Sequence, residues 1–123
     1  MTARSTASEN RSAAIDRALS ALSDPTRRAV VDLLRMQPRR AGELADALDM
    51  SAPALSRHLR VLRQSGVIAD DAVEEDARVK LYRLQPEIFT TLRDWLDEVE
   101  SFWGEQLQSF KAHAERKSTS RRK

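Results

Sequence analysis

The stretch RAGELADALDMSAPALSRHLRVLRQSGVI, residues 40–68, decides the fold of this chain. Its first part predicts a short helix whose apolar side chains recur every three to four positions, namely Leu44, Ala45 and Leu48. Residues 49–51 form a turn, and a second helix runs to Gly66, which suits a left-handed C-cap. This order is typical of a helix-turn-helix unit, although an ordinary helical hairpin in a small core would have the same pattern.

The second helix has one apolar side and one basic side. Ser51 suits its N-cap, since the hydroxyl can accept a free backbone N–H, and Pro53 falls where a missing N–H costs nothing. The apolar stripe consists of Leu55, Leu59 and Leu62. Arg57 and Arg60 fall on the other side, and no Asp or Glu occurs from Ser51 to Gly66. A solvated helix face usually mixes both signs, so this one indicates a polyanionic partner such as DNA.

The flanking segments complete a small, mainly α fold with one β-hairpin. Two helices precede the helix-turn-helix unit, and Asp24-Pro25 reads as N-cap and first residue of the second of them. Residues 67–69 and 78–84 are strand-like, and the polar stretch between them, DDAVEED, predicts a turn. A hairpin after a helix-turn-helix unit is a wing, so the expected fold is a winged helix-turn-helix with the order α-α-α-α-β-β-α.

A long amphipathic helix is expected to begin at Pro86. About 25 residues of helix span roughly 38 Å, more than one small winged domain can cover. Both tryptophans and all three phenylalanines fall in this segment. Such aromatic area requires a second surface, so we expect one edge of the helix to pack on its own domain and the other on a second copy of the chain. The expected dimer contacts are Leu92, Leu96, Val99, Trp103 and Leu107.

Charge is distributed unevenly along the chain. Residues 1–66 carry 11 Lys/Arg against 7 Asp/Glu, residues 67–110 carry 4 against 11, and residues 111–123 carry 6 against 1. We expect a disordered segment over residues 1–11, one winged helix-turn-helix domain with its dimerisation helix over 12–111, and a basic flexible tail over 112–123. No signal peptide or membrane span is expected, which predicts a cytoplasmic protein; a nucleoid-associated pool would follow from DNA binding.

These motifs resemble the ArsR/SmtB family of bacterial winged-helix repressors. The resemblance rests on ALSDPTRRAVVDLL, GELADAL, SAPALSRHLRVLRQSGVI and KLYRL, and it covers about residues 15–110. It implies a homodimer that binds an inverted-repeat DNA operator and represses transcription, often at its own promoter.

The resemblance points to a branch of the family without a metal site. Metal-sensing members carry cysteines on the first helix of the helix-turn-helix unit, where this chain has ELADAL at residues 43–48 and no cysteine anywhere. Other members bind zinc on the last helix, where the one histidine here is His113. We therefore expect no metal and no cofactor; a small apolar inducer near the last helix remains open.

The expected DNA-binding residues lie on the second helix of the unit and on the returning strand of the wing: Ser51, Ala54, Ser56, Arg57, His58, Arg60, Arg78 and Lys80. Arg57 and Arg60 can reach guanine edges or phosphates, while Arg78 and Lys80 are candidates for phosphates alone. For His58, a partly packed helix residue is an alternative to a DNA contact.

Two positions depart from the family pattern. Ala52 stands where a polar residue is common. The wing carries five acids, three of them Glu74, Glu75 and Asp76, where the family is commonly basic, so we expect its tip to stand off the phosphates.

Two other function classes compete with a DNA-binding regulator. A winged helix can serve as a protein-interaction or adaptor module without specific DNA binding, and the acidic wing and last helix would suit that role. An enzyme is disfavoured, because the three glycines make no phosphate loop and no nucleophile–base pair has motif spacing.

Overall fold

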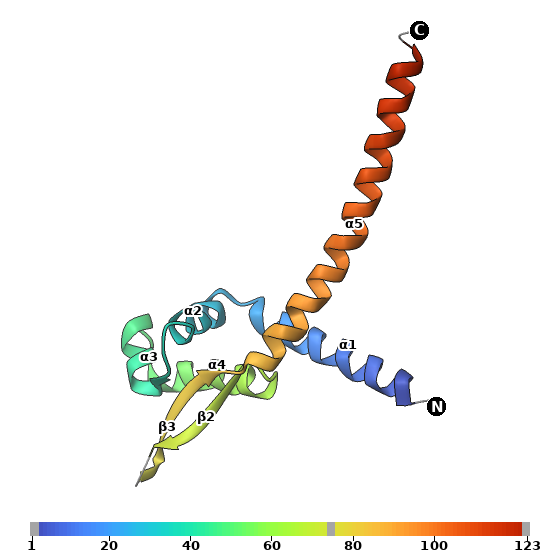
Figure 1. Cartoon of the computed structure of the whole chain (residues 1–123). Helices are drawn as coiled ribbons and strands as arrows, with labels where there is room; N and C mark the ends of the chain where they lie inside the picture. The colour runs from blue at the N-terminus through green and yellow to red at the C-terminus, as the bar shows by residue number, and fades with distance from the viewer. Residues whose placement is uncertain (1–2, 74–75, 122–123) are drawn as a thin grey trace. The chain divides into compact units, whose positions relative to one another are not determined.

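A computed structural model of the chain describes residues 3–73 and 76–121. The fold is mainly helical with a small antiparallel sheet, which confirms the expected winged helix-turn-helix class (Figure 1). In chain order the elements are α1 (Ala3–Leu22), α2 (Pro25–Leu34), β1 (Arg39–Arg40), α3 (Ala41–Leu48), α4 (Ala52–Gln64), β2 (Ile68–Val73), β3 (Asp76–Leu84) and α5 (Pro86–Arg121). Along the described ranges no helix combines the length and the apolar composition that crossing a lipid bilayer requires.

The chain divides into two units, residues 1–91 and 92–123. The core of the first unit is built from all five helices and the start of the wing. Its buried apolar side chains are Ile15, Ala18, Ala21, Val30, Leu34, Leu44, Ala45, Leu55, Leu59, Leu62, Val67, Ile68 and Ile88. Removing this apolar surface from water is what favours the arrangement of α1–α4 around the sheet.

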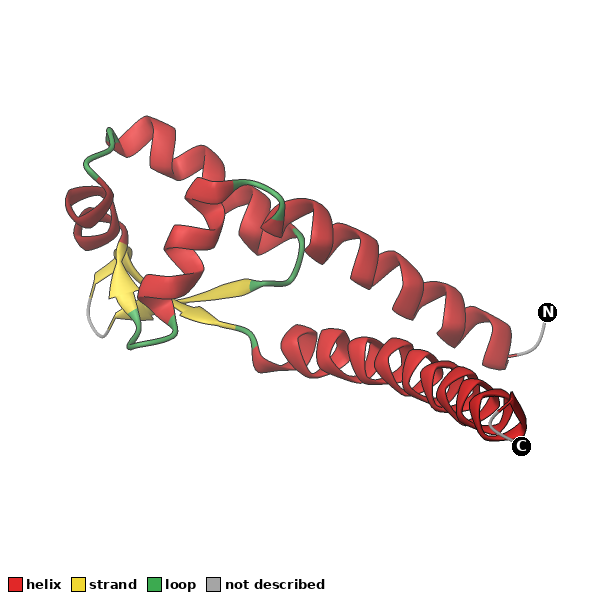
Figure 2. Ribbon diagram, turned by 90° about the horizontal axis from the view of Figure 1, so that it is seen from above, coloured by secondary structure: helices red, strands yellow, loops and turns green. Residues whose placement is uncertain are grey.

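The sheet has three strands in the order β1-β3-β2 and adjoins α3 and α4 (Figure 2). Asp70 of β2 lies opposite Tyr82 of β3, and Ala72 lies opposite Lys80. The short strand β1 was not expected, because two residues after Pro38 are too few to give an alternating pattern. It pairs with the other edge of β3, where Arg39 lies opposite Tyr82, and gives that edge backbone partners.

The hairpin is longer than the sequence predicts. β2 continues to Val73 through residues that were interpreted as a polar turn, because pairing with β3 outweighs the low strand propensity of aspartate. The acids Glu74 and Glu75 at its tip lie outside the described residues.

Both ends of the chain are more helical than expected. The segment 1–11 was predicted to be disordered, but α1 already begins at Ala3, and residues 6–10 of it are exposed. The tail 112–123 was predicted to be flexible, but α5 continues to Arg121. After Phe110 this helix contains neither glycine nor proline, and its Ala, Glu, Lys and Arg residues are strong helix formers without any apolar stripe to reveal them. The structure divides the chain near residue 91, and the domain boundaries expected at residues 12 and 111 stay predictions.

Candidate nucleic-acid interface

The start of α4 is fixed by the turn that precedes it. Asp49 adopts a left-handed conformation with φ of 52°, and the Met50 backbone N–H donates to the Ala45 carbonyl oxygen over 2.9 Å. Aspartate tolerates this region better than most residues. Ser51 then caps α4 as expected, since its Oγ accepts a hydrogen bond from the Ala54 N–H at 3.3 Å. The turn and the cap thereby fix the direction of α4 at its N-terminus.

The body of α4 has the two sides that the sequence predicts. Leu55, Leu59 and Leu62 are buried, and Gly66 ends the helical segment with a φ of 76°. On the outer side Arg57 and Arg60 are exposed, and neither makes a hydrogen bond or ion pair with any residue that the structure describes. Ser51 and Ser56 are exposed as well, whereas Ala54 is half-buried. Two guanidinium groups are thus presented to solvent on one side of a helix that is anchored on the other.

His58 lies apart from this outer side. It is half-buried, with its Nδ1 3.9 Å from Asp24 Oδ2 and 3.5 Å from Arg27 Nη1 at the junction of α1 and α2. Asp24 caps α2 by accepting the Arg27 backbone N–H at 2.9 Å. This hydrogen bond, with the positive charges of Arg27 and His58, lowers the pKa of the Asp24 carboxyl. The geometry favours the packed alternative for His58, in which it joins α4 to the start of α2.

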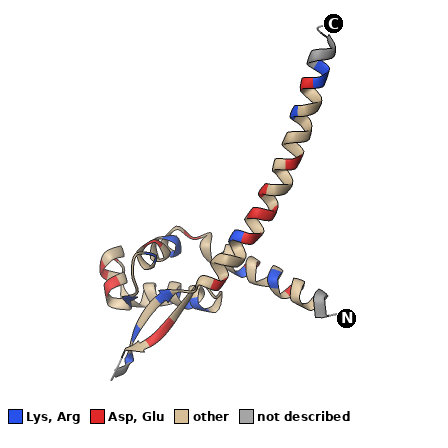
Figure 3. Cartoon of the chain, in the orientation of Figure 1, with Lys and Arg blue, Asp and Glu red and all other residues tan. Residues whose placement is uncertain are grey.

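The wing brings an acid and two cations together. Asp70 of β2 lies 3.4 Å from Arg63 Nη1 and 3.4 Å from Lys80 Nζ, and the neighbouring Asp71 lies 2.8 Å from Arg83 Nε. Figure 3 shows residues of both signs along the hairpin. Lys80, a predicted phosphate contact, is therefore already paired within the protein. Arg78 is exposed.

A small cleft joins α4 to β3. It has a volume of about 170 Å³ and collects three of the predicted residues with others that were not predicted. Its lining consists of Ser56, Leu59, Arg60, Arg63, Lys80 and Tyr82. Sequence reasoning missed Arg63, Asp70 and Tyr82 as site residues, because their proximity depends on strand register. The only signal was the separation of Arg63 and Asp70 by seven residues across the turn at Gly66.

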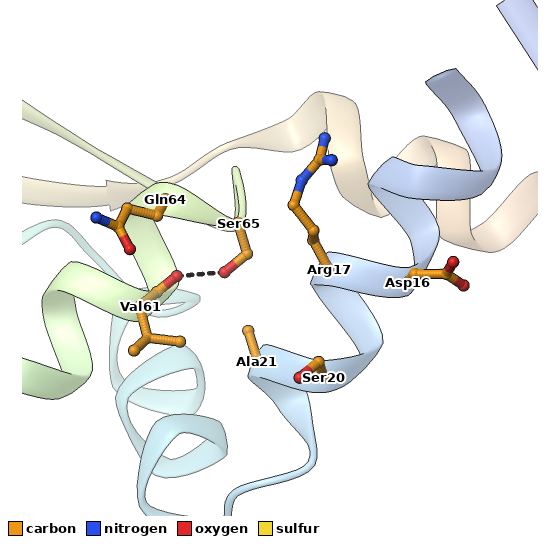
Figure 4. Close-up of a pocket in the computed structure, with 7 residues that line it drawn as sticks. All are labelled: Asp16, Arg17, Ser20, Ala21, Val61, Gln64 and Ser65. Carbon is orange, nitrogen blue, oxygen red and sulfur yellow. Dashed lines mark hydrogen bonds between the residues drawn. The ribbon is translucent and has the colours of Figure 1, made fainter. Parts of the chain in front are cut away.

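A second cavity, of about 340 Å³, lies between α1 and α4 (Figure 4). Its lining is Asp16, Arg17, Ser20, Ala21, Val61, Gln64 and Ser65. The Ser65 hydroxyl is turned back onto α4, where it donates to the Val61 carbonyl oxygen. That bond satisfies the buried Ser65 hydroxyl within α4 itself.

The C-terminal part of α5 carries the predicted dimer contacts. Trp103 and Leu107 are 60% and 61% exposed, Leu96 is 55% exposed, and Val99 is 39% exposed, while Leu92 is buried. Phe102 and Phe110 are also exposed. Large apolar side chains at this spacing form a continuous uncovered stripe, of the kind that marks an interaction surface.

No group of three or more His, Cys, Asp or Glu side chains within residues 3–73 and 76–121 is arranged to hold a metal ion. His113 near the end of α5 is exposed.

Known proteins are similar to this chain in sequence and in fold. The model of the arsR family of bacterial regulatory proteins matches residues 24–70. The HTH-type transcriptional regulator Rv2034 of Mycobacterium tuberculosis is 39% identical over 95 residues, which cover 77% of this chain and 83% of that protein. The arsenical resistance operon repressor of Escherichia coli is 33% identical over 100 residues, covering 80% of this chain and 83% of the repressor. A crystal structure of an ArsR family transcriptional regulator matches with a TM-score of 0.66 and 34% identity, covering 74% of this chain and 91% of that one. The chain therefore belongs to the ArsR family and is a DNA-binding transcriptional regulator with a winged helix-turn-helix fold.

Proposed function

We propose that the protein is a homodimeric repressor that binds an inverted-repeat operator by placing α4 of each subunit in the major groove. The observation that carries the proposal is the outer side of α4. Arg57 and Arg60 have no intramolecular partner among the described residues, and no acid occurs from Ser51 to Gly66. A guanidinium held in this way can donate two hydrogen bonds to guanine O6 and N7.

Repression is part of the proposal because of the relatives of this chain, and the inverted repeat because of the exposed stripe on α5. Among its relatives, the arsenical resistance operon repressor and the transcriptional repressor SdpR of Bacillus subtilis are named as repressors. A second copy is supported by the exposed apolar side chains of α5 from Leu96 to Phe110, which would be costly to leave in water. A twofold dimer presents two α4 helices, so its operator must repeat with the same symmetry.

Regulation in this proposal does not run through a metal ion. The chain has no cysteine, and its two histidines, His58 and His113, lie on different helices. His58 is also engaged with Asp24 and Arg27. A cytoplasmic location follows from the proposed target, chromosomal DNA.

Selection of bound duplexes from a random pool by the purified full chain tests the proposal. We expect enrichment of one inverted repeat whose half-sites are centred about one helical turn, roughly 10 bp, apart. A variant with both Arg57→Ala and Arg60→Ala should enrich nothing. Equal recovery of all sequences by the unaltered protein would favour the adaptor alternative, with charge-driven binding only.

A further inference from the structure

Asp70 connects the wing to α4 through ion pairs. Its carboxylate lies 3.4 Å from Arg63 Nη1 at the end of α4 and 3.4 Å from Lys80 Nζ on β3. The Asp70 side chain is only 18% exposed, while those of Arg63 and Lys80 are 47% and 44% exposed. The acid is thus set into the surface between two cations that face solvent. Arg63 and Lys80 can both meet an anion that approaches from solvent, and both are already paired with Asp70.

The cleft beside this ion pair has the chemistry of a phosphate site. Arg60, Arg63 and Lys80 supply three positive charges, and Ser56 and Tyr82 supply two hydroxyl donors. The sheet explains why they converge, because Lys80 and Tyr82 are two residues apart on β3 and so lie on one face. The same register puts Tyr82 opposite Asp70. Arg60 makes no ion pair with the residues that the structure describes.

We propose that this cleft receives one phosphate of the DNA backbone. When no DNA is bound, Asp70 pairs with Arg63 and Lys80 in place of that phosphate. The inference rests on the proposed function and adds an internal competitor to it. Carboxylate and phosphate are bound by the same charge-assisted hydrogen bonds, and the two anions repel each other if both are present. An ion pair of partly exposed side chains is weak enough for a phosphate to displace it. Asp70 then lowers the affinity for every duplex without changing which sequence is preferred.

Replacing Asp70 by Asn tests the competition, with Asp71→Asn as the matched control. Both changes remove one negative charge from adjacent residues of β2, but Asp71 pairs with Arg83, which does not line the cleft. Anisotropy titrations of a labelled random-sequence duplex, repeated over a range of KCl, give the affinity and its salt slope. D70N should bind about three- to tenfold more tightly at low salt, with a slope steeper by about one phosphate contact. D71N should change the affinity less and leave the slope as it was.

A second pair of variants isolates Lys80. The gain from D70N should largely disappear in a Lys80→Gln background, because the cation that Asp70 releases is then missing. Thermal melting of all four variants shows whether each is folded at the temperature of the titrations. Weaker binding by D70N would overturn the proposal, since Asp70 would then be positioning the two cations for DNA. Equal effects of D70N and D71N would overturn it as well, because net charge alone would account for both.

The source of the anion is tested with inorganic phosphate. At constant ionic strength, phosphate should displace the duplex from D70N no better than chloride does. Much stronger displacement would assign the cleft to a free phosphate and overturn the assignment to DNA. If the unaltered protein binds no duplex at all, the proposed function fails. If it binds but D70N gives no gain, only this inference fails.

Discussion

The cations near the proposed interface differ in what already holds them. Arg63 and Lys80 are paired with Asp70, and Arg83 is paired with Asp71, whereas Arg57 and Arg60 make no such contact with described residues. A side chain without an intramolecular partner breaks no ion pair within the protein when it meets a base or a phosphate. We therefore propose that Arg57 reads a base, that Arg60 can reach either a base or the phosphate of the cleft, and that Arg63 and Lys80 contact the phosphate.

Replacement of Arg57 by Ala should weaken binding to the selected operator by about 1–3 kcal/mol, because a bidentate contact with guanine is lost. Arg35→Ala is the matched control, since Arg35 is an exposed arginine at the C-cap of α2 whose Nε lies 3.6 Å from Asp32 Oδ1. Titration of both variants with operator and with random duplex separates the effects. The same small loss of operator affinity in both variants would show that Arg57 contacts no base and that only the net charge has changed.

Asp24 gives a prediction about pH and stability. The Arg27 N–H, and the charges of Arg27 and His58, hold the pKa of the Asp24 carboxyl below its usual value. A group whose pKa is lowered by folding stabilises the protein above its unfolded pKa, and that stabilisation is lost as the pH falls through the folded pKa. At neutral pH the Asp24→Ala variant should therefore unfold at a lower urea concentration than the unaltered protein. The gap between the two midpoints should narrow as the pH falls. Asp24→Asn keeps a capping oxygen and should lose less. A gap that widens as the pH falls would contradict this sign.

At the scale of the elements, α5 supplies the test of assembly. Val99→Asp should shift the protein from dimer to monomer, because pairing would bury an unpaired charge, whereas Val99 is partly exposed in the single chain. Ser101→Asp adds the same charge to an exposed position about 200° around the helix from residue 99 and should leave the dimer intact. Sedimentation velocity distinguishes the two. A folded dimer of the Val99 variant would place the subunit contact on another surface.

Local chemistry made α4 predictable and left other elements hidden. The cap at Ser51, the leucine stripe and the left-handed Gly66 depend on neighbours within one turn, and all three are confirmed. By contrast, β1 and the Asp70 ion pairs depend on the register of β3, which no local pattern specifies. The orientation of His58 depends on the packing of α4 against the α1–α2 junction. The helical ends of α1 and α5 were missed because helix propensity without amphipathicity resembles a polar loop.

For the whole molecule, we predict that metal ions do not regulate DNA binding. Zinc or arsenite at low micromolar concentration should leave operator affinity unchanged, since the chain has no cysteine and the described residues form no group of three possible ligands. The measurement is a titration of operator with and without each ion. Release of DNA by one equivalent of zinc, abolished by His113→Ala, would show that a site forms on α5 in the dimer.

Guanine methylation interference on the selected operator tests whether two α4 helices read the major groove as a symmetric pair. Methylation at N7 blocks contacts in the major groove only. We expect two patches of interference, related by the twofold axis and centred roughly 10 bp apart, each reduced in the Arg57→Ala variant. A single patch, or tight binding that no guanine methylation affects, would contradict it.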